Sequence, residues 1–329
     1  MWMAVQCVTT STSTADDSCA SADTSSSSAS ASDIGSLVNL EAFPIEDVSR
    51  PFLAAARTAL FETGVASFPD FLRPAAVAAA AGEATLASPT AFVTDNEHNA
   101  WQTERNTSLP ADHLANLFMR TRVASVATDE IGPTLKRLYE AISHTSWRRD
   151  GLRVLTPSCV QAPELLAFLS ALLQRPLFRL DDPIGACTIN VFREGWHHAW
   201  HFDEAEFTVT LSLQAADEGG HFVFTPPLRT SADDPANAAV ASVLRAQTEH
   251  AFSLPGDGTG ESGGAAVPVR TAPFAPGTLQ VFAGRDSFHA VTPTRGPRER
   301  LVAVLCFASR PGVRNSPAVQ QMFWGRTSS

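Results

Sequence analysis

The sequence predicts an α+β fold in which N-terminal helices brace an antiparallel jelly roll. Up to about Leu180, apolar residues recur at helical spacing. After Leu180, short segments rich in β-branched and aromatic residues alternate with Gly, Pro and Asp, which is typical of a sandwich or barrel. The chain has 329 residues and is 44% hydrophobic, so it can bury a large core.

Composition also indicates how the chain is divided. Residues 1–34 are almost entirely Ser, Thr, Ala and Asp, and such a segment cannot bury enough apolar surface to fold, so we expect a disordered leader. Residues 35–329 are predicted to form a single domain. Its expected parts are helical support over 35–180, a jelly-roll core over 181–310 and a C-terminal tail over 311–329.

Periodicity predicts the individual elements. We expect helices over 48–64 (ending at Gly64), 73–87, 122–143 (interrupted at Pro133), 162–174 and 233–247, and a short strand and turn over 65–72. Strands are expected within 185–195, 206–215, 219–228, 277–285, 287–294 and 300–308. The Gly-rich stretch 253–270 reads as a surface loop.

Charge and cysteine usage exclude several classes of function. The formal charge of −10 and a pI of about 5.3 disfavour nucleic-acid binding. No window approaches the run of about 18 uncharged apolar residues that a membrane span requires, and the N-terminus lacks the basic region of a secretory signal. Five cysteines without a pairing pattern indicate a reducing compartment, so we expect a cytoplasmic protein acting on a small molecule.

The stretch WHHAWHFDEAEFTVTLSLQ, residues 196–214, is the strongest functional signal. If it is extended, His201 and Asp203 point to the same face. A distal histidine, His289, would complete the two-histidine, one-carboxylate facial triad of non-haem Fe(II) enzymes. The alternatives are a solvated strand end for the HxD, and His221 in place of His289 as the third ligand.

Arginines follow the distal histidine in TPTRGPRERLVAVLCF. An arginine about ten residues beyond the ligand can reach into a barrel and bind a carboxylate in bidentate fashion. Arg298 and Arg300 would share one strand face. We favour Arg300 because it directly precedes the apolar run, and Arg298 is the alternative.

Taken together, HFD, GGHFVF and PGTLQVFAGRDSFHAVTPTRGPRERLVAVLCF resemble the Fe(II)/2-oxoglutarate-dependent dioxygenase superfamily over about 180–310. The texture looks most like the branch that contains free-amino-acid halogenases and related hydroxylases. The resemblance implies a cupin-like double-stranded β-helix, Fe(II) held by His201, Asp203 and His289, and 2-oxoglutarate and O2 as cosubstrates. It also implies that a basic residue binds the distal carboxylate of 2-oxoglutarate. Asn190 could contact that cosubstrate or be a plain strand-edge amide.

One departure within the resemblance bears on the reaction. Halogenating members carry a small residue where this chain has Asp203, so the resemblance implies hydroxylation of an unactivated C–H rather than halogenation. Desaturation or ring closure begins with the same hydrogen abstraction and stays open. A catalytically silent jelly roll that binds a small molecule, and an oxygenase acting on a protein side chain, are the competing functions.

Four further residues are candidates for binding the primary substrate. His198 and Glu204 flank the HxD, Arg105 lies in a polar loop, and Trp324 could close over the site and exclude water. The alternatives are that His198 is a partly exposed residue at the rim, that Arg105 forms a surface ion pair, and that Trp324 only packs the C-terminal tail. The set favours a compact polar substrate, and by family analogy a free amino acid or derivative.

Overall fold

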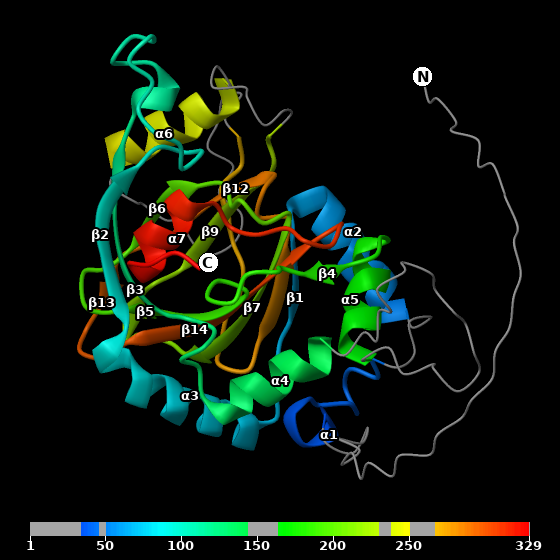
Figure 1. Cartoon of the computed structure of the whole chain (residues 1–329). Coiled ribbons are helices and arrows are strands. Elements are labelled where there is room, and N and C mark those ends of the chain that lie inside the picture. Colours follow the sequence, from blue (N-terminus) through cyan, green and yellow to red (C-terminus); the bar gives the residue numbers. More distant parts are fainter. Residues whose placement is uncertain (1–33, 46–50, 144–163, 230–237, 251–266, 329) are drawn as a thin grey trace, which may run out of the picture.

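Two facing antiparallel sheets form the core of the protein (Figure 1). The computed structural model describes residues 34–45, 51–143, 164–229, 238–250 and 267–328. Within these ranges the larger sheet has the order β1-β11-β7-β14-β5-β3-β2, with β4 also pairing with β14, and the smaller has the order β10-β9-β12-β6. Strands β8 and β13 pair separately. The predicted α+β jelly roll is therefore confirmed.

The strand bounds of the larger sheet are β1 Val65–Phe68, β2 Phe92–His98, β3 Met119–Val126, β4 Phe178–Arg179, β5 Cys187–Phe192, β7 Phe207–Gln214, β11 Leu279–Phe282 and β14 Arg300–Ala308. The smaller sheet and the separate pair comprise β6 His198–His201, β9 Phe222–Pro227, β10 Arg270–Thr271, β12 Ser287–Val291, β8 Glu218–Gly219 and β13 Thr294–Arg295.

Helices pack around the two sheets. They are α1 Ile34–Leu37, α2 Pro51–Thr63, α3 Pro74–Ala87, α4 Pro133–Ser143, α5 Glu164–Leu173, α6 Ala238–His250 and α7 Pro317–Trp324. Short 3-10 turns span Ser88–Thr90 and Leu114–Asn116. In Figure 1, α3 and α4 run beneath the larger sheet and α7 (red) lies on its other side, where it contacts β2 and β3. None of the described helices is long and apolar enough to cross a membrane.

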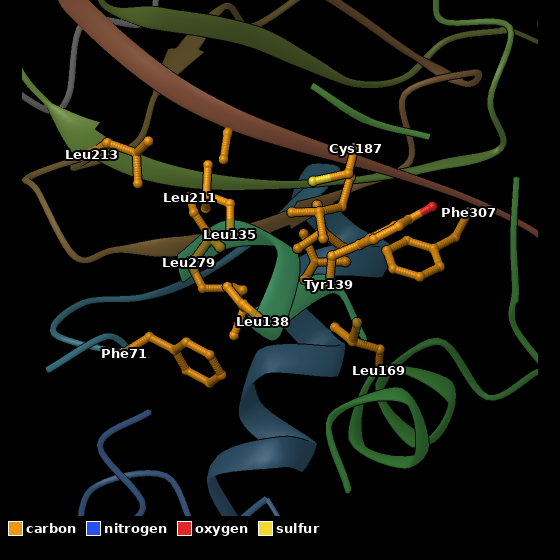
Figure 2. Close-up of a cluster of buried hydrophobic side chains, with 14 of the residues drawn as sticks. Phe71, Leu135, Leu138, Tyr139, Leu169, Cys187, Leu211, Leu213, Leu279 and Phe307 are labelled. Atoms are coloured by element: carbon orange, nitrogen blue, oxygen red, sulfur yellow. The ribbon is translucent and has the colours of Figure 1, made fainter. Parts of the chain in front are cut away.

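Alternation along β7, FTVTLSLQ, separates the two sides of the larger sheet. Val209, Leu211 and Leu213 face the helices and join the main core, whereas Thr208 and Thr210 face the space between the sheets. Figure 2 shows the apolar side, where Leu135, Leu138 and Tyr139 of α4 and Leu169 of α5 meet side chains of the sheet. Polar groups are thereby left for the interior chamber.

A second, smaller core lies on the outer face of the β10-β9-β12-β6 sheet. Trp200, Phe202 and Phe288 pack there together with Val240 and Val243 of α6. Phe202 therefore points away from its neighbours His201 and Asp203, as the alternation of the stretch predicts.

The predicted elements are correct over most of the described chain, with one clear error. Helix α2 ends at Gly64, whose φ of +94° places it in the left-handed region that glycine favours. The helix predicted over 122–143 begins only at Pro133, because Met119–Val126 is strand β3, held between β2 and β5. The expected leader, residues 1–34, lies outside the described residues except for Ile34, and the Gly-rich loop is described only from residue 267.

Candidate metal centre

Adjacent strands bring the two predicted histidine ligands together. His201 ends β6, and in the β6–β12 ladder it lies directly opposite His289. Their ring centroids are 4.2 Å apart. Asp203 follows β6 by two residues, and its Oδ1 lies 3.3 Å from Nε2 of each histidine. The three ligand atoms all lie within 4.8 Å of one another.

Backbone hydrogen bonds orient both imidazoles. Nδ1 of His201 lies 2.8 Å from the carbonyl of Ala199, and Nδ1 of His289 lies 2.8 Å from the carbonyl of Ser287. A carbonyl can only accept, so each Nδ1 carries the hydrogen and each neutral ring presents a bare Nε2 lone pair. This outer support is what ligating histidines use to fix their tautomer.

The Asp203 carboxylate is held in place by a hydrogen bond from Thr208 and by close contact with Gly284. Thr208 of β7 donates from Oγ1 to Oδ2 of Asp203 at 2.6 Å, and the Asp203 amide donates to the Gly284 carbonyl. A Cβ on Gly284 would lie 2.1 Å from Oδ2, so only glycine leaves room for the carboxylate. Oδ1 is thereby left facing the histidines.

The electrostatics of this cluster suit a cation. Burial, reinforced by the neighbouring His289, lowers the pKa of His201 and favours its neutral form. An anion and two lone pairs that converge on one point repel one another unless a cation lies between them. Two imidazoles and one carboxylate are the donor set of non-haem Fe(II) sites, so the residues fit that metal.

A chamber extends from the triad between the two sheets and reaches Arg300. The Arg300 side chain is buried on β14, and burial lowers its pKa to about 9. It lies over the rings of Phe192 and Phe274, at 5.1 and 5.5 Å. In the part of the chain that the structure describes, no ion pair or hydrogen bond engages its guanidinium. A buried arginine of this kind is suited to an anionic ligand.

Of the two other residues expected to bind the cosubstrate, one lies inside this chamber and the other outside it. Asn190 of β5 lines this chamber and accepts a 3.4 Å hydrogen bond from Ser125. Arg298 is exposed and does not line it. β14 begins only at Arg300, after a turn at Gly296 whose φ is +86°, so the two arginines do not share a strand face as expected.

A second chamber adjoins the first at Asn190, His198, His201, Asp203 and Val304 and extends beneath α7. His198 and Trp324, two of the residues predicted to contact the substrate, both line it. His198 stacks on His201 with centroids 3.9 Å apart, and burial, followed by the charges of the neighbouring histidines, lowers its pKa well below the usual value. Phe323 of α7 lies 5.6 Å from the His198 ring.

Glu204 and Arg105, the other two predicted substrate contacts, both have hydrogen-bond partners within the protein. Glu204 lines the second chamber, but both its carboxylate oxygens accept 2.7 Å hydrogen bonds from Ser316, the N-cap of α7. Glu204 therefore anchors that helix. Arg105 is exposed, packs over Phe118 and donates to the Asn116 carbonyl, so it lies outside both chambers. His221 is also exposed and takes no part in the cluster, as its rejection as a ligand predicted.

Sequence reasoning missed three residues around the triad. Gln102 and Phe323 line the second chamber, and His98 of β2 lies 5.8 Å from the ring of His201. His98 bonds to Thr121 Oγ1 at 2.6 Å, and burial lowers its pKa to about 4. The alternation of residue types along Met119–Val126 indicates a strand. A strand at this position needs a partner strand, and the partner is β2, which ends at His98.

Comparison with known proteins gives structural similarities only. No known family and no curated protein matches the sequence. Among solved structures, the non-heme alpha ketoglutarate dependent epimerase SnoN from nogalamycin biosynthesis is 17% identical over 78% of this chain and 83% of its own, with a TM-score of 0.48. The carbocyclase SnoK from the same pathway is 13% identical over 84% and 92%, with a TM-score of 0.46. A Pseudomonas putida prolyl-4-hydroxylase is 15% identical over 78% and 100%, with a TM-score of 0.42. These similarities concern the fold, whereas function depends on the side chains of the site.

Proposed function

We propose that the protein is an Fe(II)- and 2-oxoglutarate-dependent oxygenase that hydroxylates an unactivated C–H of a small molecule. The observation that carries the proposal is one continuous chamber in which two imidazole lone pairs and a carboxylate converge at one end while a buried arginine without a described partner closes the other. The reaction would be R–H + O2 + 2-oxoglutarate → R–OH + succinate + CO2.

Each residue has a defined task in this proposal. His201, Asp203 and His289 would hold Fe(II), which when bound supplies the oxidising chemistry. Arg300 would pair with the distal carboxylate of 2-oxoglutarate, with Asn190, Thr210 and Gln280 as further polar groups of the same chamber. α7 would exclude water from the substrate side.

The carboxylate also supports hydroxylation over halogenation. Asp203 stands between the two histidines with one oxygen directed at them and the other held by Thr208. A bound carboxylate fills the coordination position that a halide would need. We therefore expect no incorporation of chloride when the enzyme turns over in its presence.

The test pairs cosubstrate binding with turnover. Anaerobic addition of Fe(II) and 2-oxoglutarate to the metal-free protein should produce a weak visible charge-transfer band, and admitting O2 should yield succinate. Arg300→Gln should raise the 2-oxoglutarate concentration needed for half-saturation by about 100-fold or more, as expected for losing a charged, buried hydrogen-bonding partner.

Arg298→Gln is the matched control, because it removes an exposed arginine two residues away and should leave the requirement unchanged. A protein that shows neither the band nor succinate would be a binding protein with this fold. If Arg298→Gln had the larger effect, the assignment of the arginine would be wrong.

A further inference from the structure

We infer that the second chamber binds an uncharged molecule with an apolar, ring-sized body and one neutral donor–acceptor group, such as an amide or hydroxyl, that Gln102 and Trp324 recognise. This inference rests on the proposed function, for which it names the substrate class. It differs from the free amino acid that the sequence suggested.

Three polar atoms that line this chamber are buried without a hydrogen-bond partner: Gln102 Oε1, His198 Nε2 and Trp324 Nε1. A buried polar atom that stays unpaired is unfavourable, and native structures contain few of them. Three around one chamber next to a metal centre indicate that a ligand provides the missing partners. Indole Nε1 can only donate and an amide oxygen can only accept, so the ligand must offer both an acceptor and a donor.

The surrounding structure holds both recognising side chains in place. Gln102 donates from Nε2 to the Phe202 carbonyl at 2.9 Å, which leaves its Oε1 as the free end. The Trp324 ring packs against Gly185, where an added Cβ would lie 2.6 Å from the ring. α7 carries Trp324 and is itself tied to Glu204 through Ser316. The two contacts are therefore set before a ligand binds, which reduces the ordering cost of recognition.

The described chamber offers no partner for a charged substrate. No lysine or arginine lines it, and the Glu204 carboxylate is already hydrogen-bonded by Ser316 through both oxygens. Asp203 is committed to the triad. The ammonium and carboxylate of a free amino acid would therefore lose water without gaining counter-charges, and buried unpaired charges are strongly unfavourable.

Much of the remaining wall is apolar and favours a compact hydrophobic body; it is formed by Ala205, Val304, Cys306, Val319, Phe323 and the Trp324 ring. The polar side chains of Ser125, Thr188, Asn190 and Asn315 also line the chamber, where Ser125 donates to Asn190 and Asn315 donates to Asp182. Phe323 and Trp324 are neighbours on α7, with ring centroids 6.2 Å apart, and both line the chamber. Such aromatic surface binds rings through offset or edge contacts.

Three small probes of similar size separate the possibilities in full-length, metal-free protein, with dissociation constants measured by ligand-observed NMR titration. Acetanilide offers a ring, a neutral donor and an acceptor. N-Methylacetanilide lacks the donor, and L-phenylalanine carries both charges. We expect acetanilide to bind at least tenfold more tightly than L-phenylalanine and about fivefold more tightly than N-methylacetanilide.

The variants test the recognising atoms. Trp324→Phe and Gln102→Leu should each weaken acetanilide binding by about five- to tenfold, the range expected for one lost hydrogen bond. Trp101→Phe, next to Gln102 but outside the chamber, is the matched control and should have no effect. Arg300→Gln should also leave acetanilide binding intact, because Arg300 lines the other chamber.

Tighter binding of L-phenylalanine, absence of acetanilide binding, or unchanged binding in both Trp324→Phe and Gln102→Leu would overturn the inference. These outcomes are independent of the iron and 2-oxoglutarate titration. A protein that binds 2-oxoglutarate with Fe(II) but fails the probe test would keep its proposed reaction and lose only this substrate class. A protein that passes the probe test but does not bind 2-oxoglutarate with Fe(II) would support the ligand class of the second chamber and contradict the proposed reaction.

Discussion

Gly284 illustrates how a single residue without a side chain can be necessary for the metal centre. Its Cα lies so close to Asp203 that a Cβ would clash with three atoms of the Asp203 side chain, two of them in the carboxylate. Its φ is not in the left-handed region, so the requirement is for space alone. The Asp203 carboxylate is also linked to Thr208 of β7, so it cannot move away without losing that hydrogen bond.

Gly284→Ala should therefore displace the carboxylate and weaken binding of a divalent metal by about tenfold or more, while the chain stays folded. The weakening follows because loss of one well-placed ligand or its support typically costs 10–100-fold in metal affinity. Competition titration with a metal-sensitive dye measures it. Gly82→Ala is the control, since nothing lies within 4 Å of that position on α3, and it should stabilise the protein by about 0.5–1 kcal/mol without changing metal affinity.

At the scale of the element, α7 is attached to the rest of the molecule by two carboxylates, of which Asp182 is buried and Glu204 half-buried. Glu204 caps its first turn through Ser316. Asp182, which precedes β5, accepts from Asn315 at 2.8 Å and from Gln320 at 2.9 Å through one oxygen, and from the Ile184 and Gly185 amides through the other. The helix that covers the second chamber is thus held by a carboxylate network rather than by a large apolar face.

Asp182→Asn should lower the free energy of unfolding at pH 7 by about 1–3 kcal/mol, since hydrogen bonds to a charged acceptor are lost or weakened. Urea unfolding measures the change. Asp181→Asn provides the control, because Asp181 is exposed and its side chain forms a 3.7 Å surface ion pair with Arg314, the loss of which should have little effect. Equal effects of the two substitutions would show that the network does not stabilise the fold.

The same network predicts a pH dependence. Burial would raise the pKa of Asp182, but hydrogen bonds from Gln320, Gly185, Ile184 and Asn315 outweigh it and lower that pKa. The folded state therefore favours the ionised carboxyl. The contribution of the ionised Asp182 carboxylate to the free energy of unfolding is fully present above the pKa of about 4 that the group has in the unfolded chain. It is lost as the pH falls through the lower pKa that the group has in the folded protein. The stability difference between the native protein and Asp182→Asn should narrow between pH 5 and pH 3, and a constant difference would contradict the assignment.

At the scale of the whole molecule, the metal centre joins parts that are distant in the sequence. His201 and Asp203 belong to the β6 region, His289 to β12, and Thr208, which supports Asp203, to the larger sheet. A bound cation would therefore connect the two sheets at one point. Because the site exists only in the folded chain, metal binding is linked to folding.

Removal of metal with a chelator should lower the melting temperature, and Fe(II) or Mn(II) at 100 times its dissociation constant should restore about 2.7 kcal/mol. For a chain of this size that corresponds to roughly 5 °C in a thermal melt. Asp203→Asn should abolish the metal-dependent shift, whereas Glu194→Gln, an exposed acid near β6, should retain it. A shift that survives in Asp203→Asn would place the metal elsewhere.

The features that could be predicted from the sequence depend on residues close together in the chain. Alternation along a strand is enough to put His201 and Asp203 on one face with Phe202 on the other, and to direct Arg300 into the interior with alternate residues of β14. Composition and periodicity were enough for the α+β class and for most described elements. These features depend on neighbours two to four residues apart, which the sequence displays directly.

Only the tertiary structure decided which distant groups meet. Strands β2 and β3 are stabilised by pairing with segments distant in the sequence. Most residues of β2 are exposed, so its sequence lacks the apolar alternation that would indicate a strand. Arg105 and Glu204 looked like substrate contacts because they are polar and near the motif, yet Asn116 and Ser316 engage them. Gln102 became a candidate contact because folding left one of its atoms buried and unpaired beside Trp324, and that property exists only in three dimensions.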